Sequence, residues 1–140
     1  MNGTFKNKTV IVVGAGDEPC SEIAVALARQ DACVLLIGQE RDKLAAVQKR
    51  IQEIGGQARV YACDVNNTSE LTHLSQEINN QFGGCECLIN GSGREMKKIF
   101  SANTNIKIHA EGAYVASWIE RRTDMPISTD QRDSRLYLCM

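Results

Sequence analysis

Short apolar runs alternate along the chain with longer segments in which apolar residues recur every three or four positions. The largely apolar runs cover residues 9–13, 33–37, 59–63 and 85–90. Runs that are apolar on successive positions, rather than on every second one, are typical of parallel strands buried on both faces. The pattern therefore predicts four buried strands.

The segments between these runs predict three helices. Residues 19–30 have apolar side chains at helical spacing and begin with Pro19, which is suited to a first helical turn. Residues 41–54 form a second periodic segment, and the pair Gly55-Gly56 provides its end. The third helix is predicted between a capping box and another glycine pair, namely Asn67 with Glu70 and Gly83-Gly84.

Alternating strands and helices predict an α/β fold with a doubly wound, Rossmann-like parallel sheet. Right-handed crossovers give the strand order 3-2-1-4, with a ligand crevice at the carboxyl ends of strands 1 and 4. Residues 135–139 predict a further strand, so we expect a truncated sheet of about four to five strands. The length predicts one domain over residues 1–140, with a core over 1–93 and a divergent helix and tail over 94–140.

The charge of the chain is balanced. Sixteen lysines and arginines stand against 17 aspartates and glutamates, which gives a net charge of −1. Neither sign forms a long block, so we expect no nucleic acid and no membrane as partners. The sequence shows no apolar stretch long enough for a membrane span and no apolar signal region, which predicts a cytoplasmic protein.

The six cysteines lie at positions 20, 33, 63, 85, 87 and 139, several of them within the apolar runs. We interpret them as buried thiols in a reducing compartment. Cys85 and Cys87 have C-x-C spacing, with no second cysteine pair and no paired histidines to complete a metal site. We therefore predict no metal site.

A glycine-containing turn follows the first predicted strand. Gly14-Ala-Gly-Asp-Glu18 stands where a nucleotide-binding βα unit places its phosphate loop. Such a loop presents backbone N–H groups and a positive helix N-terminus to a pyrophosphate. Asp17 and Glu18 oppose that chemistry, because two carboxylates would face an anion. The position predicts dinucleotide binding, and the charges predict that this binding is weak.

Three further landmarks follow at the ends of the other predicted strands. Together the four segments read Val13-Gly14-Ala-Gly-Asp-Glu-Pro-Cys20, Gly38-Gln39, Cys63-Asp64-Val65 and Leu88-Ile-Asn-Gly-Ser-Gly93. In this order and spacing the chain resembles the N-terminal half of the short-chain dehydrogenases/reductases, whose corresponding motifs are TGxxxGxG, an acid or Gly-Arg, Asp-Val and NNAG. The resemblance covers residues 6–93 and implies an NAD(P)-binding oxidoreductase relative.

The resemblance also implies which residues bind the dinucleotide: Gly14, Gly16, Gly38, Arg41, Asp64, Val65, Asn90, Gly91 and Gly93. Gly38 would leave room for the 2′-phosphate of NADP, with Arg41 in place of the usual arginine, so the sequence favours NADP over NAD. Asp64 would hydrogen-bond the adenine amino group, and Asn90 would line the ribose and nicotinamide side. The alternatives are that Asp64 caps a turn and that Asn90 ends a strand.

Two departures from the family pattern concern the turn. Glu18 and Cys20 stand where the second and third signature glycines fall. Glu18 would repel the pyrophosphate, and Cys20 would place a side chain where the helix should approach the strand. We expect that changing both to glycine raises the affinity for dinucleotide. Alternatively, Gly16 completes the turn in a shifted register.

A third departure concerns catalysis. The family reaction requires a Tyr-x-x-x-Lys pair, which occurs nowhere in the 140 residues, so we assign no catalytic residue. Two functions remain open: a catalytically incomplete oxidoreductase relative, or a non-catalytic interaction module, that is, a pseudoenzyme. A predicted fifth helix near residues 109–122 has an apolar face with Val115, Trp118 and Ile119, which predicts a homo-oligomer or a protein partner.

Overall fold

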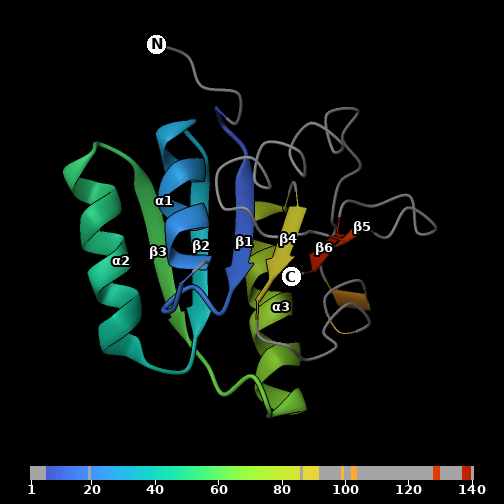
Figure 1. Cartoon of the computed structure of the whole chain (residues 1–140). Coiled ribbons are helices and arrows are strands. Elements are labelled where there is room, and N and C mark those ends of the chain that lie inside the picture. The colour runs from blue at the N-terminus through green and yellow to red at the C-terminus, as the bar shows by residue number, and fades with distance from the viewer. Residues whose placement is uncertain are drawn as a thin grey trace.

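A computed structural model describes residues 6–18, 20–85 and 87–91, together with 99, 102–103, 128–129 and 137–139. Figure 1 shows these parts as one mainly parallel sheet with helices on both faces. The elements, in chain order, are β1 Thr9–Val13, α1 Cys20–Arg29, β2 Cys33–Gly38, α2 Arg41–Glu53, β3 Gln57–Ala62, α3 Thr68–Phe82, β4 Cys87–Asn90, β5 Ser128–Thr129 and β6 Tyr137–Cys139.

The strand order in the sheet is β3-β2-β1-β4-β6-β5. The pairs among β1, β2, β3 and β4 are all parallel, and β6 runs parallel to β4. These findings confirm the predicted doubly wound α/β fold and its 3-2-1-4 order. They also confirm a further strand within residues 135–139, of which the structure describes Tyr137–Cys139. The prediction missed β5, a two-residue strand that pairs antiparallel with β6 and is too short to produce a hydrophobic pattern.

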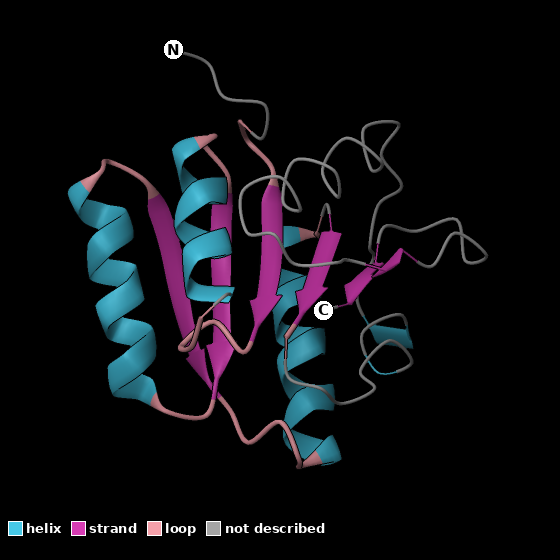
Figure 2. Ribbon diagram, viewed as in Figure 1, coloured by secondary structure: helices cyan, strands magenta, loops and turns pink. Residues whose placement is uncertain are grey.

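Alternate residues of each central strand point into two separate core layers. In β1, Val10 and Val12 pack in the layer with α1 and α2, whereas Ile11 and Val13 pack in the layer with α3. Figure 2 shows the helices on the two sides of the strands. Because both faces are covered, the strands require apolar residues at successive positions, which is the pattern found in the sequence.

The ends of the helices follow from local hydrogen bonds and glycine. The side chain of Asn67 accepts a hydrogen bond from the Glu70 N–H at 3.2 Å, which confirms the predicted N-cap of α3. Gly83 ends α3 in the left-handed region with φ 73°, and Gly55 follows α2 with φ 81°. Two predicted boundaries were wrong by two residues: β3 begins at Gln57 and β4 at Cys87. Gln57 is polar and exposed at its end of the strand, so hydrophobicity could not reveal that start.

Candidate functional site

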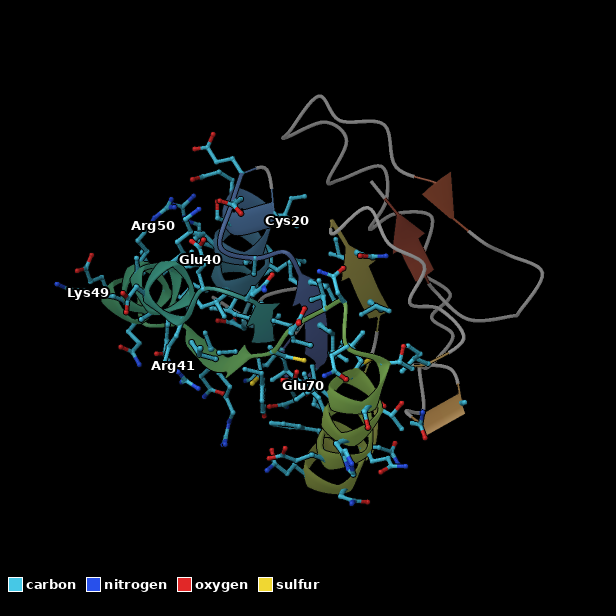
Figure 3. The ribbon with its side chains drawn as sticks, turned by 90° about the horizontal axis from the view of Figure 1, so that it is seen from below. Cys20, Glu40, Arg41, Lys49, Arg50 and Glu70 are labelled. Carbon is cyan, nitrogen blue, oxygen red and sulfur yellow. The ribbon has the colours of Figure 1, made fainter. Side chains whose placement is uncertain are left out.

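The carboxyl ends of four parallel strands meet at one edge of the sheet, which Figure 3 shows from below. Three backbone hydrogen bonds continue beyond the strands at this edge: Gly14 N–H to Ile37 C=O at 2.8 Å, Cys63 N–H to Gly38 C=O at 2.8 Å, and Gly91 N–H to Val13 C=O at 2.9 Å. The segments after β1, β2, β3 and β4 are therefore held side by side. Most of the predicted binding residues lie on these segments.

The turn after β1 depends on two glycines for different reasons. Gly14 has φ 82°, a conformation that is costly for residues with a side chain. Gly16 approaches α2 closely, because a Cβ atom added there would lie 3.0 Å from the Cβ of Lys43. The carbonyl of Gly14 accepts the N–H of Asp17 at 3.3 Å, which closes the turn. The turn is therefore built around Gly14 and Gly16.

The acid at position 17 has a cationic partner that the sequence reasoning missed. The Lys43 ammonium lies 2.9 Å from Asp17 Oδ1 and 3.2 Å from Glu40 Oε2. Hydrogen bonds to these two carboxylates, that of Asp17 first, raise the pKa of Lys43. The Asp17 carboxylate is thus directed towards α2 and paired, which corrects the expectation of two uncompensated acids in the turn.

A second link joins the same two helices. Arg50 of α2 donates two hydrogen bonds to the Glu22 carboxylate of α1, at 2.9 and 3.2 Å. The pKa of Arg50 is raised, chiefly by Glu22 and to a smaller extent by the Glu18 carboxylate. Glu18 is exposed and lies within electrostatic range of Arg50. Figure 3 labels Arg50 and Glu40 on the side of the sheet where α1 and α2 lie.

Leu44 of α2 packs closely against the segment after β2. Gly38 is buried, and a Cβ atom there would lie 3.1 Å from Cδ2 of Leu44 and 3.5 Å from its Cγ. A side chain at position 38 would therefore meet Leu44, and the choice between NADP and NAD stays a prediction. Arg41 is exposed in the first turn of α2, next to this segment.

The segments after β3 and β4 carry the remaining predicted residues. Asp64 Oδ1 accepts the N–H of Asn66 at 2.9 Å, so this carboxylate does cap a turn. Val65 packs against the core layer of α3. Asn90 is buried at the end of β4 and Gly91 is exposed beside it, whereas Gly93 lies outside the described residues. The predicted fifth helix also lies outside the described residues.

Cys20 occupies the first position of α1 and is 2% exposed. Its side chain lies directly against Gly91, in the space that a Cβ atom at that glycine would occupy. Cys20 thus places a side chain where α1 approaches the end of β4, and Gly91, which has no side chain, provides the room for it. Among the described cysteines, Cys20, Cys63 and Cys85 are buried, as predicted, and Cys33 is partly exposed.

Burial of Cys20 makes the stability of the chain sensitive to alkaline pH. Desolvation, with the Asp17 carboxylate as a second cause, raises the pKa of Cys20 from 9.0 to about 11. Because the folded state holds this proton more tightly, the corresponding stability is fully present below pH ~9 and is lost as the pH rises towards ~11. Between pH 8 and 10.5, we expect the parent to lose roughly 1–2 kcal/mol more of its free energy of unfolding than Cys20→Ala. Urea denaturation at both pH values measures the difference, and equal losses would contradict it.

A pocket of about 280 Å³ lies at the opposite edge of the sheet, around the amino ends of β1, β2 and β3. Its lining residues are Lys6, Asn7, Asp31, Ala32, Cys33, Gly55, Gly56 and Gln57. None of the predicted binding residues lines it. The pocket is therefore separate from the carboxyl-edge site and offers a control location for binding experiments.

Two other features, a metal site and a membrane-spanning helix, are not found among the described residues. No three or more of their histidine, cysteine, aspartate and glutamate side chains gather into a group that could hold a metal ion. Within the same part of the chain, every helix is too short or too polar to cross a membrane. The fold and the turn at the carboxyl edge together define an α/β protein of the Rossmann type.

Comparison with known proteins gives the family. The model of the short chain dehydrogenase family matches residues 8–112, and the chain belongs to this family. An uncharacterized oxidoreductase of Haemophilus influenzae is 32% identical over 102 residues, which are 73% of this chain and 36% of that protein. The uncharacterized oxidoreductase UxuB of Bacillus subtilis is 36% identical over 93 residues, covering 66% of this chain and 34% of that protein. The chain spans about a third of the length of these curated relatives.

Solved structures agree with this assignment. A putative D-mannonate oxidoreductase from Haemophilus influenzae with bound NAD has a TM-score of 0.57 and 31% identity, and the match covers 63% of this chain and 31% of that one. A metagenomic short-chain oxidoreductase in complex with NADP has a TM-score of 0.59 and 27% identity, with 61% and 38% covered. The resemblance inferred from the sequence motifs is thereby confirmed.

Proposed function

We propose that this chain binds a nicotinamide dinucleotide at the carboxyl edge of the sheet. The observation that carries the proposal is the turn built around Gly14, which is left-handed at that residue and leads directly into α1. Among the described residues, no hydrogen bond uses the backbone N–H of Gly16 or of Glu18. Two N–H groups beside a helix N-terminus suit a pyrophosphate, whose negative charge they and the helix dipole stabilise.

The other strand ends fit the rest of the ligand. Asp64 retains acceptor capacity beyond its bond to Asn66, since a carboxylate has several lone pairs, and it would accept from the adenine amino group. Asn90 and Gly91 would flank the ribose and nicotinamide side. When bound, the dinucleotide supplies hydride-transfer chemistry. The residues of this chain would bind and orient it.

Titration with NADH and NADPH tests the proposal. We expect saturable binding, followed by dinucleotide fluorescence, that weakens as salt is raised from 50 to 500 mM because part of the attraction is electrostatic. Signals that never saturate with either dinucleotide would contradict the proposal. That result would favour the alternative of a non-catalytic interaction module.

For the choice of dinucleotide, we infer a preference for NAD(H) over NADP(H). The cation nearest the turn, Lys43, is already engaged by Asp17 and Glu40, so a 2′-phosphate would meet two carboxylates there. Leu44 fills the space beside Gly38. Both features support a preference opposite to the one that the sequence suggested.

Asp17→Asn is expected to shift this preference. The change removes one negative charge and leaves Lys43 with Glu40 as its one remaining carboxylate partner of the two, so the affinity for NADPH should rise roughly threefold to tenfold while that for NADH changes less. Parallel titrations of the parent and the variant at low and high salt measure the ratio. Asp31→Asn, on the opposite edge, is the matched control, and an equal gain for NADH and NADPH would refute the inference.

A further inference from the structure

The sulfur of Cys20 lies in the space next to Gly91 that a side chain at position 91 would need. A Cβ atom at Gly91 would overlap the Cys20 Sγ, and it would lie 3.3 Å from the Val13 carbonyl oxygen and 3.6 Å from the Cys20 Cβ. The Gly91 N–H already donates to that Val13 carbonyl at 2.9 Å, which fixes the position of its backbone. The sulfur therefore occupies the volume that a side chain at position 91 would fill.

Neither partner can easily adjust. Cys20 is 2% exposed and belongs to the core layer of α1 and α2, where a rotated sulfur would need another space in a close-packed interior. Positive φ angles occur among the described glycines at Gly14, Gly55, Gly83 and Gly84, and not at Gly91. Gly91 is thus required for its small size and not for its backbone conformation.

We propose that Cys20 and Gly91 form a size-matched pair that positions the turn over residues 14–18 against the end of β4. Relative to the family motifs, glycine is lost at position 20 and gained at position 91, where NNAG has its second asparagine. The side chain at position 20 is larger than in the family motif and the one at position 91 is smaller. The two differences offset each other, so α1 and β4 keep their close approach. The functional part rests on the proposed dinucleotide site, which these two segments flank.

Moving one heavy atom between the two residues tests the pairing. Gly91→Ala adds a methyl group against the sulfur, and we expect a lower urea midpoint and roughly tenfold weaker NADH binding. Cys20→Ala removes only the sulfur, and the two remaining Cβ atoms would then lie at the ordinary contact distance of 3.6 Å. The double variant Cys20→Ala/Gly91→Ala should recover most of the urea midpoint and of the affinity, with the 3.3 Å contact to the Val13 carbonyl oxygen as the remaining strain.

Cys85→Ala combined with Gly91→Ala is the matched control. Cys85 is another buried cysteine but belongs to the opposite core layer, so it should rescue neither property. A Gly91→Ala variant as stable as the parent would overturn the proposal. So would a Cys20→Ala/Gly91→Ala variant that is no more stable than Gly91→Ala alone.

A comparison of ligands separates positioning from general stability. Because position 91 flanks the nicotinamide side, Gly91→Ala should weaken NADH about tenfold and 5′-AMP, which lacks the nicotinamide half, less than threefold. Equal losses for both ligands would refute the positioning role. If the parent binds no NADH, the proposed function fails, whereas the urea measurements still decide whether Cys20 and Gly91 are matched.

Discussion

The purified 140-residue chain is expected to show no carbonyl reductase or alcohol dehydrogenase turnover with NADH or NADPH. General acid–base catalysis contributes at least ~100-fold to such reactions, and the Tyr-x-x-x-Lys pair that provides it in the family is absent from these residues. Tyr61 cannot replace it, because burial raises its pKa and its hydroxyl donates to Gln81 Oε1 at 3.0 Å. A catalytic tyrosine would require the opposite pKa shift.

Oxidation of NADH followed at 340 nm with a panel of aldehydes and ketones measures this turnover. We expect rates at the level of the reaction without protein, and Tyr61→Phe should leave them unchanged. Saturable turnover that co-purifies with the chain would show that an unrecognised base is present. It would also contradict the hypothesis, drawn from the sequence, of a catalytically incomplete oxidoreductase relative.

Gly14→Ala is expected to weaken dinucleotide binding by tenfold or more. The residue has φ 82°, and a side chain in the left-handed region costs roughly 1–2 kcal/mol, so the turn would adopt another conformation or be strained. The phosphate contacts proposed for the N–H groups of Gly16 and Glu18 would then be weakened or lost. The melting temperature should also fall by several degrees, for the same energetic reason.

Gly83→Ala is a matched control for this prediction. Gly83 has φ 73° at the end of α3, and a Cβ atom there would contact nothing within 4 Å, so the change introduces backbone strain alone. We expect a similar loss of melting temperature and an unchanged dinucleotide affinity. Equal effects of the two changes on affinity would mean that the turn is not part of the site.

The fold could be predicted largely from the sequence because its strands are buried on both faces. Successive apolar residues such as Val10, Ile11 and Val12 leave few alternatives to a parallel sheet, and helical spacing fixes the covering elements. The short antiparallel strand Ser128–Thr129 could not be predicted in this way. Two residues are too few to show a hydrophobic period.

Residues of the candidate site could be predicted only where the neighbouring sequence itself shows their role. Gly14 is required by the turn itself, and its position after a strand is visible in the sequence. The Asp17–Lys43 pair joins residues that are 26 positions apart, and no sequence period connects them. The Cys20–Gly91 contact had one signal in the sequence, namely two departures from the family motifs that are opposite in size.

The most direct test of the central claim is a pair of ¹H–¹⁵N correlation spectra of the labelled chain, with and without NAD⁺. If the dinucleotide binds at the carboxyl edge, the shifted amides will cluster in residues 14–18, 38–41, 64–65 and 90–91. Residues 31–33 and 55–57, around the pocket at the opposite edge, will remain unchanged. Shifts confined to that opposite edge, or no shifts at millimolar NAD⁺, would contradict the proposed site.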